Sequence, residues 1–313
     1  MRLRRVVAAT VFAYLTLSVL TGIFLCEATL HPARRPLSFD DQSRARELAP
    51  AHHATLHEAS IQTFDHITLR AWVFTPDRPN SAAVILVHGL SDNRLGMTGY
   101  AELLLDHHYS VLMPDARAHG SSDGVLATYG LVERNDIHQW FDWLTASEHP
   151  TCIYGVGESM GAAQLLQSLA VEARFCAVVA ESSFSDFREI AYDRVGQFFH
   201  TGPWLGRTAF RLAIETAFAY GRWKYHLDLT EVSPETAVAS SQVPVLLIHG
   251  IEDRNIPVRH SRRIAARNPK VVLWQVPNAD HCGALSTAPG EFERELLQWF
   301  ASTTANRAVR TEN

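Results

Sequence analysis

The hydrophobic pattern divides the chain into an apolar N-terminal segment, a polar stretch and a long region of alternating strand and helix patterns. Residues 6–26 contain no charged residue, and this length is sufficient for a helix that crosses a bilayer. The polar stretch, 27–58, contains three prolines and shows no strand alternation, so at most one short helix is expected there, over 40–48. We therefore predict a membrane anchor over 1–27 and a juxtamembrane linker over 28–59.

The rest of the chain reads as one α/β domain over 60–302, followed by a polar tail over 303–313. Apolar and polar residues alternate on both sides of Asp65-His66, which predicts a β-hairpin. A continuous apolar run, typical of a strand buried on both faces of a parallel sheet, occurs at 83–87. Further strands are expected at 109–113, 152–156, 176–180, 245–249 and 271–276. Helical patterns lie between them, at about 97–107, 131–146, 258–267 and 290–301. This order predicts a doubly wound, mostly parallel sheet with ligand chemistry at the carboxyl ends of its strands.

One interval interrupts the alternation of strands and helices. Between Ser182 and Gln242 the chain is rich in aromatic residues, and the interval is longer than a crossover connection needs. We predict a short helical cap at about 184–241. Its helices either complete the hydrophobic core or form an apolar lid over an acyl substrate.

Composition narrows the classes of function. The formal net charge is -5 and no basic stripe with interleaved aromatic residues is present, which argues against a nucleic-acid partner. The four cysteines lack paired Cys-x-x-Cys spacing and the 16 histidines share no common spacing, so no metal site is expected. Cys152 and Cys176 begin strands that should be neighbours, and they either form a disulfide in an exported domain or remain buried thiols.

The apolar segment is interpreted as an uncleaved anchor in preference to a removed signal peptide. A cleavage site needs small residues, whereas the segment ends with the bulky residues Ile23, Phe24 and Leu25. Arg2, Arg4 and Arg5 precede it. The positive-inside rule then predicts a single-pass membrane protein with a cytoplasmic N-terminus and a catalytic domain exported to the periplasmic or extracellular side.

The candidate nucleophile is Ser159, in the pentad Gly157-Glu-Ser-Met-Gly161. The pentad by itself is common, but here an apolar strand enters it and a helical pattern leaves it. That context is typical of a nucleophile elbow, in which the serine occupies a strained turn and the glycines avoid clashes.

A serine hydroxyl needs a base within hydrogen-bond reach and a carboxylate that orients the base. His281 is the candidate base because it lies in a loop after a late strand. Asp253 is the candidate acid because it follows a strand that ends at His249, which brings its carboxylate to the same sheet edge. Three other carboxylates are alternatives to Asp253, namely Glu252, Asp280 and Glu181.

Acyl transfer also requires N–H donors for the oxyanion of the tetrahedral intermediate. Met160, the residue after the nucleophile, should supply one backbone N–H at the start of a helix. Leu90, in the loop after the first buried strand, should supply the other. His88 in that loop is expected to brace the backbone.

These segments together resemble the α/β-hydrolase superfamily from about residue 60 to 302, and most closely its membrane-anchored and serine-aminopeptidase-like branches. The resemblance rests on His88-Gly89, the turn from Pro114 to Gly124, the elbow, His249-Gly250 with Asp253, and Asp280-His281. It implies a serine hydrolase without a cofactor, with Ser159, Asp253 and His281 as the triad. Ala118 departs from the family pattern, because many relatives have glycine in that turn.

The leading hypothesis is hydrolysis of a carboxylic ester, from a small-molecule or lipid-like acyl substrate, through an acyl-enzyme at Ser159. Peptide or amide cleavage uses the same triad and differs only in the pocket. A non-catalytic, membrane-tethered binding protein of the same fold is the alternative from another class, since fold does not imply function.

Overall fold

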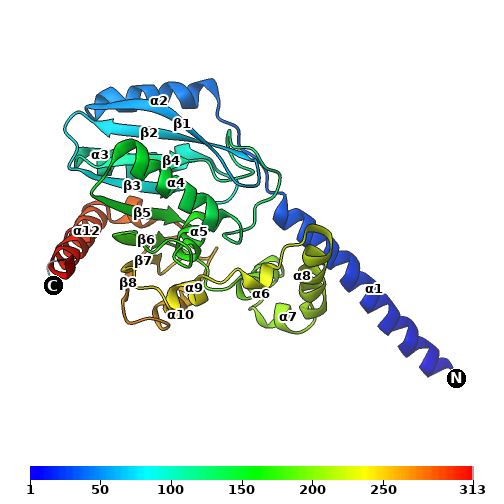
Figure 1. Cartoon of the computed structure of the whole chain (residues 1–313). Coiled ribbons are helices and arrows are strands. Elements are labelled where there is room, and N and C mark those ends of the chain that lie inside the picture. The colour runs from blue at the N-terminus through cyan, green and yellow to red at the C-terminus, as the bar shows by residue number, and fades with distance from the viewer. Residues whose placement is uncertain (312–313) are drawn as a thin grey trace. The chain divides into compact units, whose positions relative to one another are not determined.

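The computed structural model describes residues 1–311, with side chains through residue 304. The chain has an α/β fold built on one eight-stranded, mostly parallel sheet, as the sequence predicts (Figure 1). It forms two compact units. We call residues 33–185 and 233 onward the sheet unit, and residues 1–32 with 186–232 the anchor–insert unit.

The sheet has the strand order β1-β2-β4-β3-β5-β6-β7-β8. Its strands are β1 (Ala54–Gln62), β2 (Thr68–Pro76), β3 (Ala82–Val87), β4 (Ser110–Pro114), β5 (Cys152–Glu158), β6 (Ala177–Glu181), β7 (Val245–Gly250) and β8 (Val271–Val276). β2 pairs antiparallel with both β1 and β4, and all other pairs are parallel. β3 through β7 are buried almost throughout, which accounts for their mainly apolar sequences.

The predicted hairpin is confirmed, but its first strand begins earlier than the pattern indicates. β1 pairs with β2 from Ala54 opposite Pro76 to Gln62 opposite Thr68, so residues 54–59 form a strand where the sequence suggests a linker. β1 is an edge strand and most of its first residues are exposed. Exposed positions of an edge strand are often polar, so β1 gives a weak hydrophobic signal.

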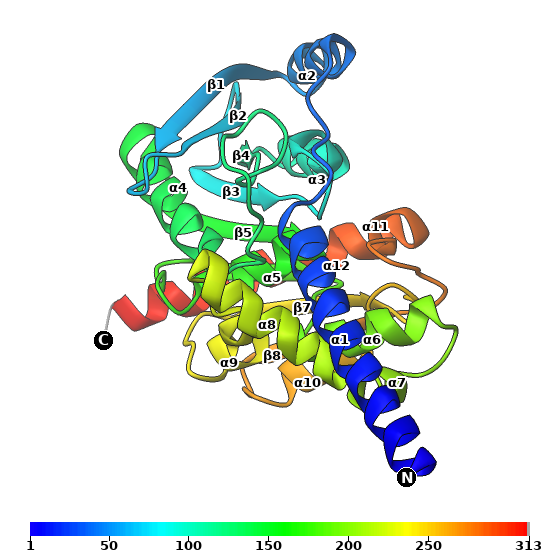
Figure 2. The same cartoon turned by 90° about the vertical axis from the view of Figure 1, so that its right-hand side faces the viewer.

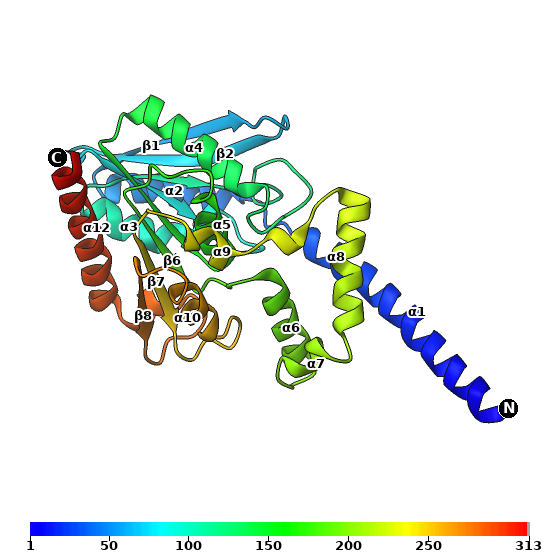
Figure 3. The ribbon, with the colours of Figure 1, turned by 60° about the horizontal axis from the view of Figure 1, so that its bottom comes forward.

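Helices cover both faces of the sheet and bury two hydrophobic cores (Figure 3). The first core contains residues of α2 (Phe39–Ala51), α3 (Thr98–Asp106) and α12 (Pro289–Thr311). The second contains residues of α4 (Glu133–Glu148), α5 (Met160–Ser168), α9 (Pro234–Ala239) and α10 (Arg259–Ala265). The short elements η1 (Arg94–Met97) and α11 (Ala284–Thr287) lie in connecting segments of the same unit. Residues 303–311, assigned to a polar tail from the sequence, continue α12, and residues 312–313 lie outside the described residues.

The anchor–insert unit contains α1 (Arg2–Leu30), α6 (Phe187–Phe198), α7 (Trp204–Arg207), α8 (Arg211–Tyr225) and η2 (Leu229–Glu231). Among the described residues, α1 is the helix long and apolar enough to cross a membrane. Its buried side is a row of residues at intervals of four, Ser18, Gly22, Cys26 and Leu30. α8 packs along α1, as Figure 2 shows. A Cβ atom at Gly22 would lie 2.5 Å from the Ala213 carbonyl oxygen, so only glycine permits this approach.

Polar contacts join the C-terminal end of α1 to the end of α8. The Glu27 carboxylate accepts hydrogen bonds from Tyr220 Oη at 2.8 Å and Tyr225 Oη at 2.7 Å, and it pairs with Lys224 Nζ at 2.6 Å. At the other end of the contact, Tyr14 Oη donates to the Ala209 carbonyl at 3.0 Å. The two helices therefore run in the same direction in one fixed register.

Cys152 and Cys176 form a disulfide in the structure and are not two buried thiols. Their Cα atoms are 5.9 Å apart, which lies in the usual range for a disulfide. The bond links the start of β5 to the residue before β6, and these strands are hydrogen-bonded neighbours. Cys26 and Cys282 are free thiols.

Candidate active site

Ser159 occupies a strained turn between β5 and α5. Its φ angle is 51°, a conformation that is unfavourable for a residue with a side chain. The chain can turn this sharply because residues 157 and 161 have no side chain. A Cβ atom at Gly161 would lie 2.1 Å from the Val87 carbonyl oxygen, and one at Gly157 would lie 2.8 Å from the Gly161 backbone. Both positions therefore require glycine, and the pentad lies at the strand-to-helix junction that the sequence predicts.

His281 lies between Ser159 and Asp253 in a continuous chain of hydrogen bonds. His281 Nε2 is 2.9 Å from Ser159 Oγ, and His281 Nδ1 is 2.8 Å from Asp253 Oδ2. The His281 side chain is 19% exposed and the Asp253 side chain is fully buried. With the proton on Nδ1, the ring donates to the carboxylate and Nε2 can accept from the serine hydroxyl.

The Asp253 carboxylate is surrounded by hydrogen-bond donors. Its Oδ1 accepts from the backbone N–H groups of Asn255 at 2.9 Å and Ile256 at 2.8 Å, and its Oδ2 lies 3.3 Å from His249 Nε2. Burial alone would raise the pKa of Asp253, but the hydrogen bonds from His249 and His281 hold that pKa below its ordinary value. The carboxylate is therefore ionised at neutral pH. The sequence indicates only that His249 ends a strand, and its contact with Asp253 was missed.

The three alternative carboxylates have other surroundings. Glu252 is exposed to solvent. Asp280 Oδ1 accepts from the backbone N–H of His281 at 2.8 Å, so it contacts the peptide and not the ring. Glu181 accepts from Tyr100 Oη at 2.7 Å and from the backbone N–H of Ala284 at 2.9 Å.

The loop after β3 is braced around Leu90. His88 is fully buried, its Nδ1 lies 2.7 Å from the Gly89 carbonyl oxygen, and its Nε2 accepts from the Ala116 N–H at 3.1 Å. Burial lowers the pKa of His88 to about 4, so the ring is neutral and can donate and accept at once. The backbone N–H groups of Leu90 and Met160 form no hydrogen bond with any described residue. They are the two donors that the sequence assigns to an oxyanion.

The turn after β4 explains why alanine can replace glycine there. Ala118 has a φ of 62°, in the left-handed region that glycine adopts most readily. The turn is held by buried Asp115, which pairs with Arg94 Nη2 at 2.7 Å and accepts from the Ser121 N–H at 2.7 Å. Ala118 therefore adopts the left-handed conformation that glycine would adopt here, and the hydrogen bonds of Asp115 hold the turn in place.

Two further acidic residues adjoin the elbow and were missed as a pair. Glu158 and Glu181 end neighbouring strands and lie opposite each other in the register of β5 and β6. Tyr100 Oη lies 2.7 Å from Glu181 Oε2 and 3.4 Å from Glu158 Oε2. Burial, together with the charges of Glu181 and Asp92, raises the pKa of Glu158 to about 7, and burial also raises the pKa of Glu181. A glutamate at the end of each of two adjacent parallel strands is the sequence signal that could have found them.

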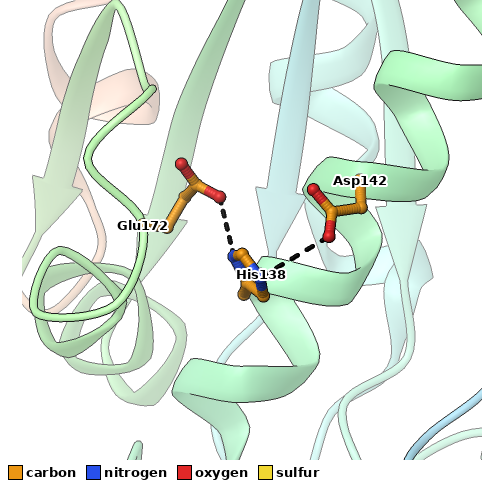
Figure 4. Close-up of side chains that lie close together, drawn as sticks. All are labelled: His138, Asp142 and Glu172. Carbon is orange, nitrogen blue, oxygen red and sulfur yellow. Dashed lines mark hydrogen bonds and ion pairs between the residues drawn. The ribbon is translucent and has the colours of Figure 1, made fainter.

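A separate cluster, His138, Asp142 and Glu172, brings together three groups of metal-ligand type (Figure 4). His138 Nδ1 lies 2.8 Å from Glu172 Oε2, and its Nε2 lies 3.5 Å from Asp142 Oδ2. Arg174 Nη2 lies 2.6 Å from Asp142 Oδ1 and also pairs with Glu172 Oε2. The guanidinium supplies the positive charge that these carboxylates need, so the cluster reads as an ion-pair network.

Comparisons with known proteins agree with this architecture. A model of the alpha/beta hydrolase family matches residues 84–295. The chain is 31% identical to the uncharacterized protein YqkD of Bacillus subtilis over 210 residues, which is 66% of each chain. It is 26% identical to the uncharacterized protein YfhR of Escherichia coli K12 over 230 residues, or 72% of each chain.

Solved structures show the same fold. The Pyrococcus furiosus esterase Pf2001 aligns with a TM-score of 0.68 at 22% identity, covering 88% of this chain and 98% of the esterase. The esterase RhEst1 from Rhodococcus sp. ECU1013 aligns with a TM-score of 0.55 at 19% identity, covering 79% of this chain and 99% of the esterase. The match to the family model, which spans more than half of the chain, shows that this protein belongs to the alpha/beta hydrolase family.

Proposed function

We propose that the protein is a serine hydrolase that cleaves carboxylic esters through an acyl-enzyme on Ser159. The observation that carries this proposal is the unbroken hydrogen-bond chain from Ser159 Oγ through His281 to the ionised Asp253. A serine, a base and an orienting acid in this order are the parts that nucleophilic acyl transfer needs.

The first half of the reaction forms the acyl-enzyme. Ser159 Oγ attacks the ester carbonyl carbon while its proton passes to His281 Nε2. Asp253 stabilises the resulting imidazolium, and the N–H groups of Leu90 and Met160 hold the oxyanion. The C–O bond then breaks, and His281 gives its proton to the departing alcohol.

The second half releases the acid. A water molecule attacks the acyl carbon, and its proton passes to His281 Nε2. The second tetrahedral intermediate then collapses, the bond to Ser159 Oγ breaks, and His281 returns the proton to the serine. Apart from the ester and water, only groups of this chain take part, so the proposed reaction needs no cofactor.

The choice of an ester over a peptide bond is supported by the solved relatives, since Pf2001 and RhEst1 are both described as esterases. A panel of p-nitrophenyl esters of increasing acyl length, compared with aminoacyl anilides, tests this choice. We expect kcat/KM for the best ester to exceed that for any anilide by at least a hundredfold. Faster anilide cleavage would instead identify a peptidase or amidase.

The enzyme proposal itself is tested with a fluorophosphonate probe on the purified full-length protein. We expect covalent labelling of the wild-type chain and none of Ser159→Ala. Absence of wild-type labelling would favour a non-catalytic binding protein, and labelling that survives Ser159→Ala would place the nucleophile elsewhere.

We also propose that α1 remains attached as a membrane anchor. Residues on one side of α1, among them Gly22 and Cys26, are buried, and Glu27 binds the end of α8. Cleavage after this segment would remove these contacts from the anchor–insert unit. Intact-mass measurement of the membrane fraction should therefore give the full chain, and a mass lacking the first 26 or so residues would contradict retention.

The catalytic domain is proposed to be exported, with Arg2, Arg4 and Arg5 on the cytoplasmic side. The disulfide between Cys152 and Cys176 supports this, since such bonds persist in oxidising compartments. Alkylation in denaturant without reductant should modify Cys26 and Cys282 only. Modification of all four cysteines in freshly isolated protein would contradict the exported location.

A further inference from the structure

Glu181, which is buried, and Glu158, which is partly buried, form an acidic pair next to Ser159. They lie opposite each other on adjacent parallel strands, where two negative charges repel. The hydroxyl of Tyr100 lies within reach of both carboxyl groups, at 2.7 Å from Glu181 Oε2 and 3.4 Å from Glu158 Oε2. Two close carboxyl groups with limited donors are most stable when they hold one proton between them.

Glu181 contacts both the elbow and the segment that carries His281. Its backbone carbonyl accepts the Ser159 N–H at 2.8 Å. Its side-chain Oε1 accepts the N–H of Ala284 at 2.9 Å, three residues after His281. A change in this carboxyl group therefore acts directly on the backbone that positions the proposed base.

Glu158 contacts the loop that carries the proposed oxyanion donor. A Cβ atom placed on Gly89 would lie 3.5 Å from Glu158 Oε1 and 3.6 Å from Ser159 Cβ. The Gly89 backbone also stabilises the charged form of Glu158. Gly89 precedes Leu90, so this carboxyl group adjoins the peptide that presents the Leu90 N–H.

We propose that Glu158 and Glu181, sharing one proton beside Tyr100, are positioning residues that hold the Leu90 loop and the His281 segment at Ser159. Neither side chain touches the reacting atoms. When the shared proton leaves, a second negative charge repels the first and opposes the oxyanion that forms nearby, so the reaction slows. This inference rests on the proposed hydrolase function and deepens it.

The groups around the pair place this titration near neutral pH. The titratable groups that face it are Tyr100 from α3, Asp92 from the loop after β3, His249 from β7, and His281 and Cys282 from the loop after β8. Burial, followed by the charges of Glu181 and Asp92, raises the pKa of Glu158 to about 7. The pair should therefore lose its proton within the pH range of ordinary assays.

The experiment measures kcat/KM for p-nitrophenyl butyrate from pH 6 to 9 with full-length wild-type protein, Glu158→Gln and Glu252→Gln. Glu252 is the matched control, because it is an exposed glutamate at the same edge of the sheet. Dividing each variant by wild type at every pH isolates the pH dependence that the substitution itself changes. We expect the Glu158→Gln ratio to rise at least fivefold between pH 6 and 9, and the Glu252→Gln ratio to stay constant.

Glu181→Gln provides a second variant, since it too leaves a single carboxyl group, and its ratio should rise in the same way. Ratios that stay flat for both variants, with fluorophosphonate labelling of Ser159 intact, would overturn the positioning role and leave the hydrolase proposal standing. Absence of labelling would overturn both proposals about the reaction. Urea unfolding then still decides whether the pair shares a proton: wild type should lose stability from pH 6 to 9 relative to Glu158→Gln, and equal slopes would contradict the sharing.

Discussion

Asp253 and the pair Glu158–Glu181 lie at the same edge of one sheet, but the fold surrounds them with different groups. Asp253 is met by two backbone N–H groups and two histidines, which keep it ionised despite burial. The two carboxyl groups of the pair share the Tyr100 hydroxyl, Glu181 also accepts the Ala284 N–H, and burial raises the pKa of both. Burial raises the pKa of the carboxyl groups in both places, so the number of hydrogen-bond donors for each carboxyl group decides whether it is charged.

The largest effect that this comparison predicts is on catalysis by Asp253→Asn. An amide carries no negative charge, and its NH2 group can donate to His281 Nδ1, which favours the wrong tautomer of the ring. We expect kcat on a p-nitrophenyl ester to fall by about 10 000-fold, as for the equivalent change in other serine triads. A loss below tenfold would remove Asp253 from the role of acid.

The next prediction concerns stability at acid pH. The pKa of Asp253 is lowered in the folded state, so its contribution to stability is present above its unfolded pKa of about 3.9 and is lost as the pH falls below that value. The unfolding free energy falls between pH 7 and pH 2, and Asp253→Asn should make that fall smaller by about 2 kcal/mol, the size expected for a typical buried, paired aspartate. Urea unfolding between pH 2 and 7 measures it, and an unchanged limb would contradict the lowered pKa.

Tyr100→Phe tests the other side of the comparison. The change removes the hydroxyl that serves both carboxyl groups and leaves Glu181 with one donor fewer. Loss of a buried hydrogen bond should lower the unfolding free energy by about 1–2 kcal/mol. The loss should be greater at pH 8 than at pH 5.5, since more negative charge is then left without the hydroxyl. An equal loss at both pH values would show that the tyrosine acts only through packing.

The smallest effect is expected for Asp280→Asn. This carboxylate adjoins His281 in sequence but accepts only backbone N–H groups, from His281 at 2.8 Å and Arg254 at 3.4 Å. Asparagine can accept the same bonds through its side-chain oxygen. We expect kcat/KM to stay within about threefold of wild type. A large loss here with a small one for Asp253→Asn would exchange the roles of the two residues.

Local sequence signals were sufficient for most of the fold. The mainly apolar runs correctly indicated β3 to β7, because both faces of those strands are buried, and also the edge strand β8, which is only partly buried. The pattern was wrong for residues 54–59, because β1 is an exposed edge strand whose pairing depends on β2. The extension of α12 beyond residue 302 was also missed, since residues 303–311 are mostly polar and show no apolar periodicity.

The sequence by itself indicated the elbow, because a serine between glycines 157 and 161, with a strand before it and a helix after it, is typical of that turn, and the close approaches there do require glycine. It also determined that an acid and a histidine follow strands ending at the same edge. Only the tertiary structure decided which groups surround each carboxyl group: His249 for Asp253, and Tyr100 with a second glutamate for Glu158. These partners come from segments far apart in the chain, and the charge of a buried carboxyl group depends on such neighbours more than on its own sequence context.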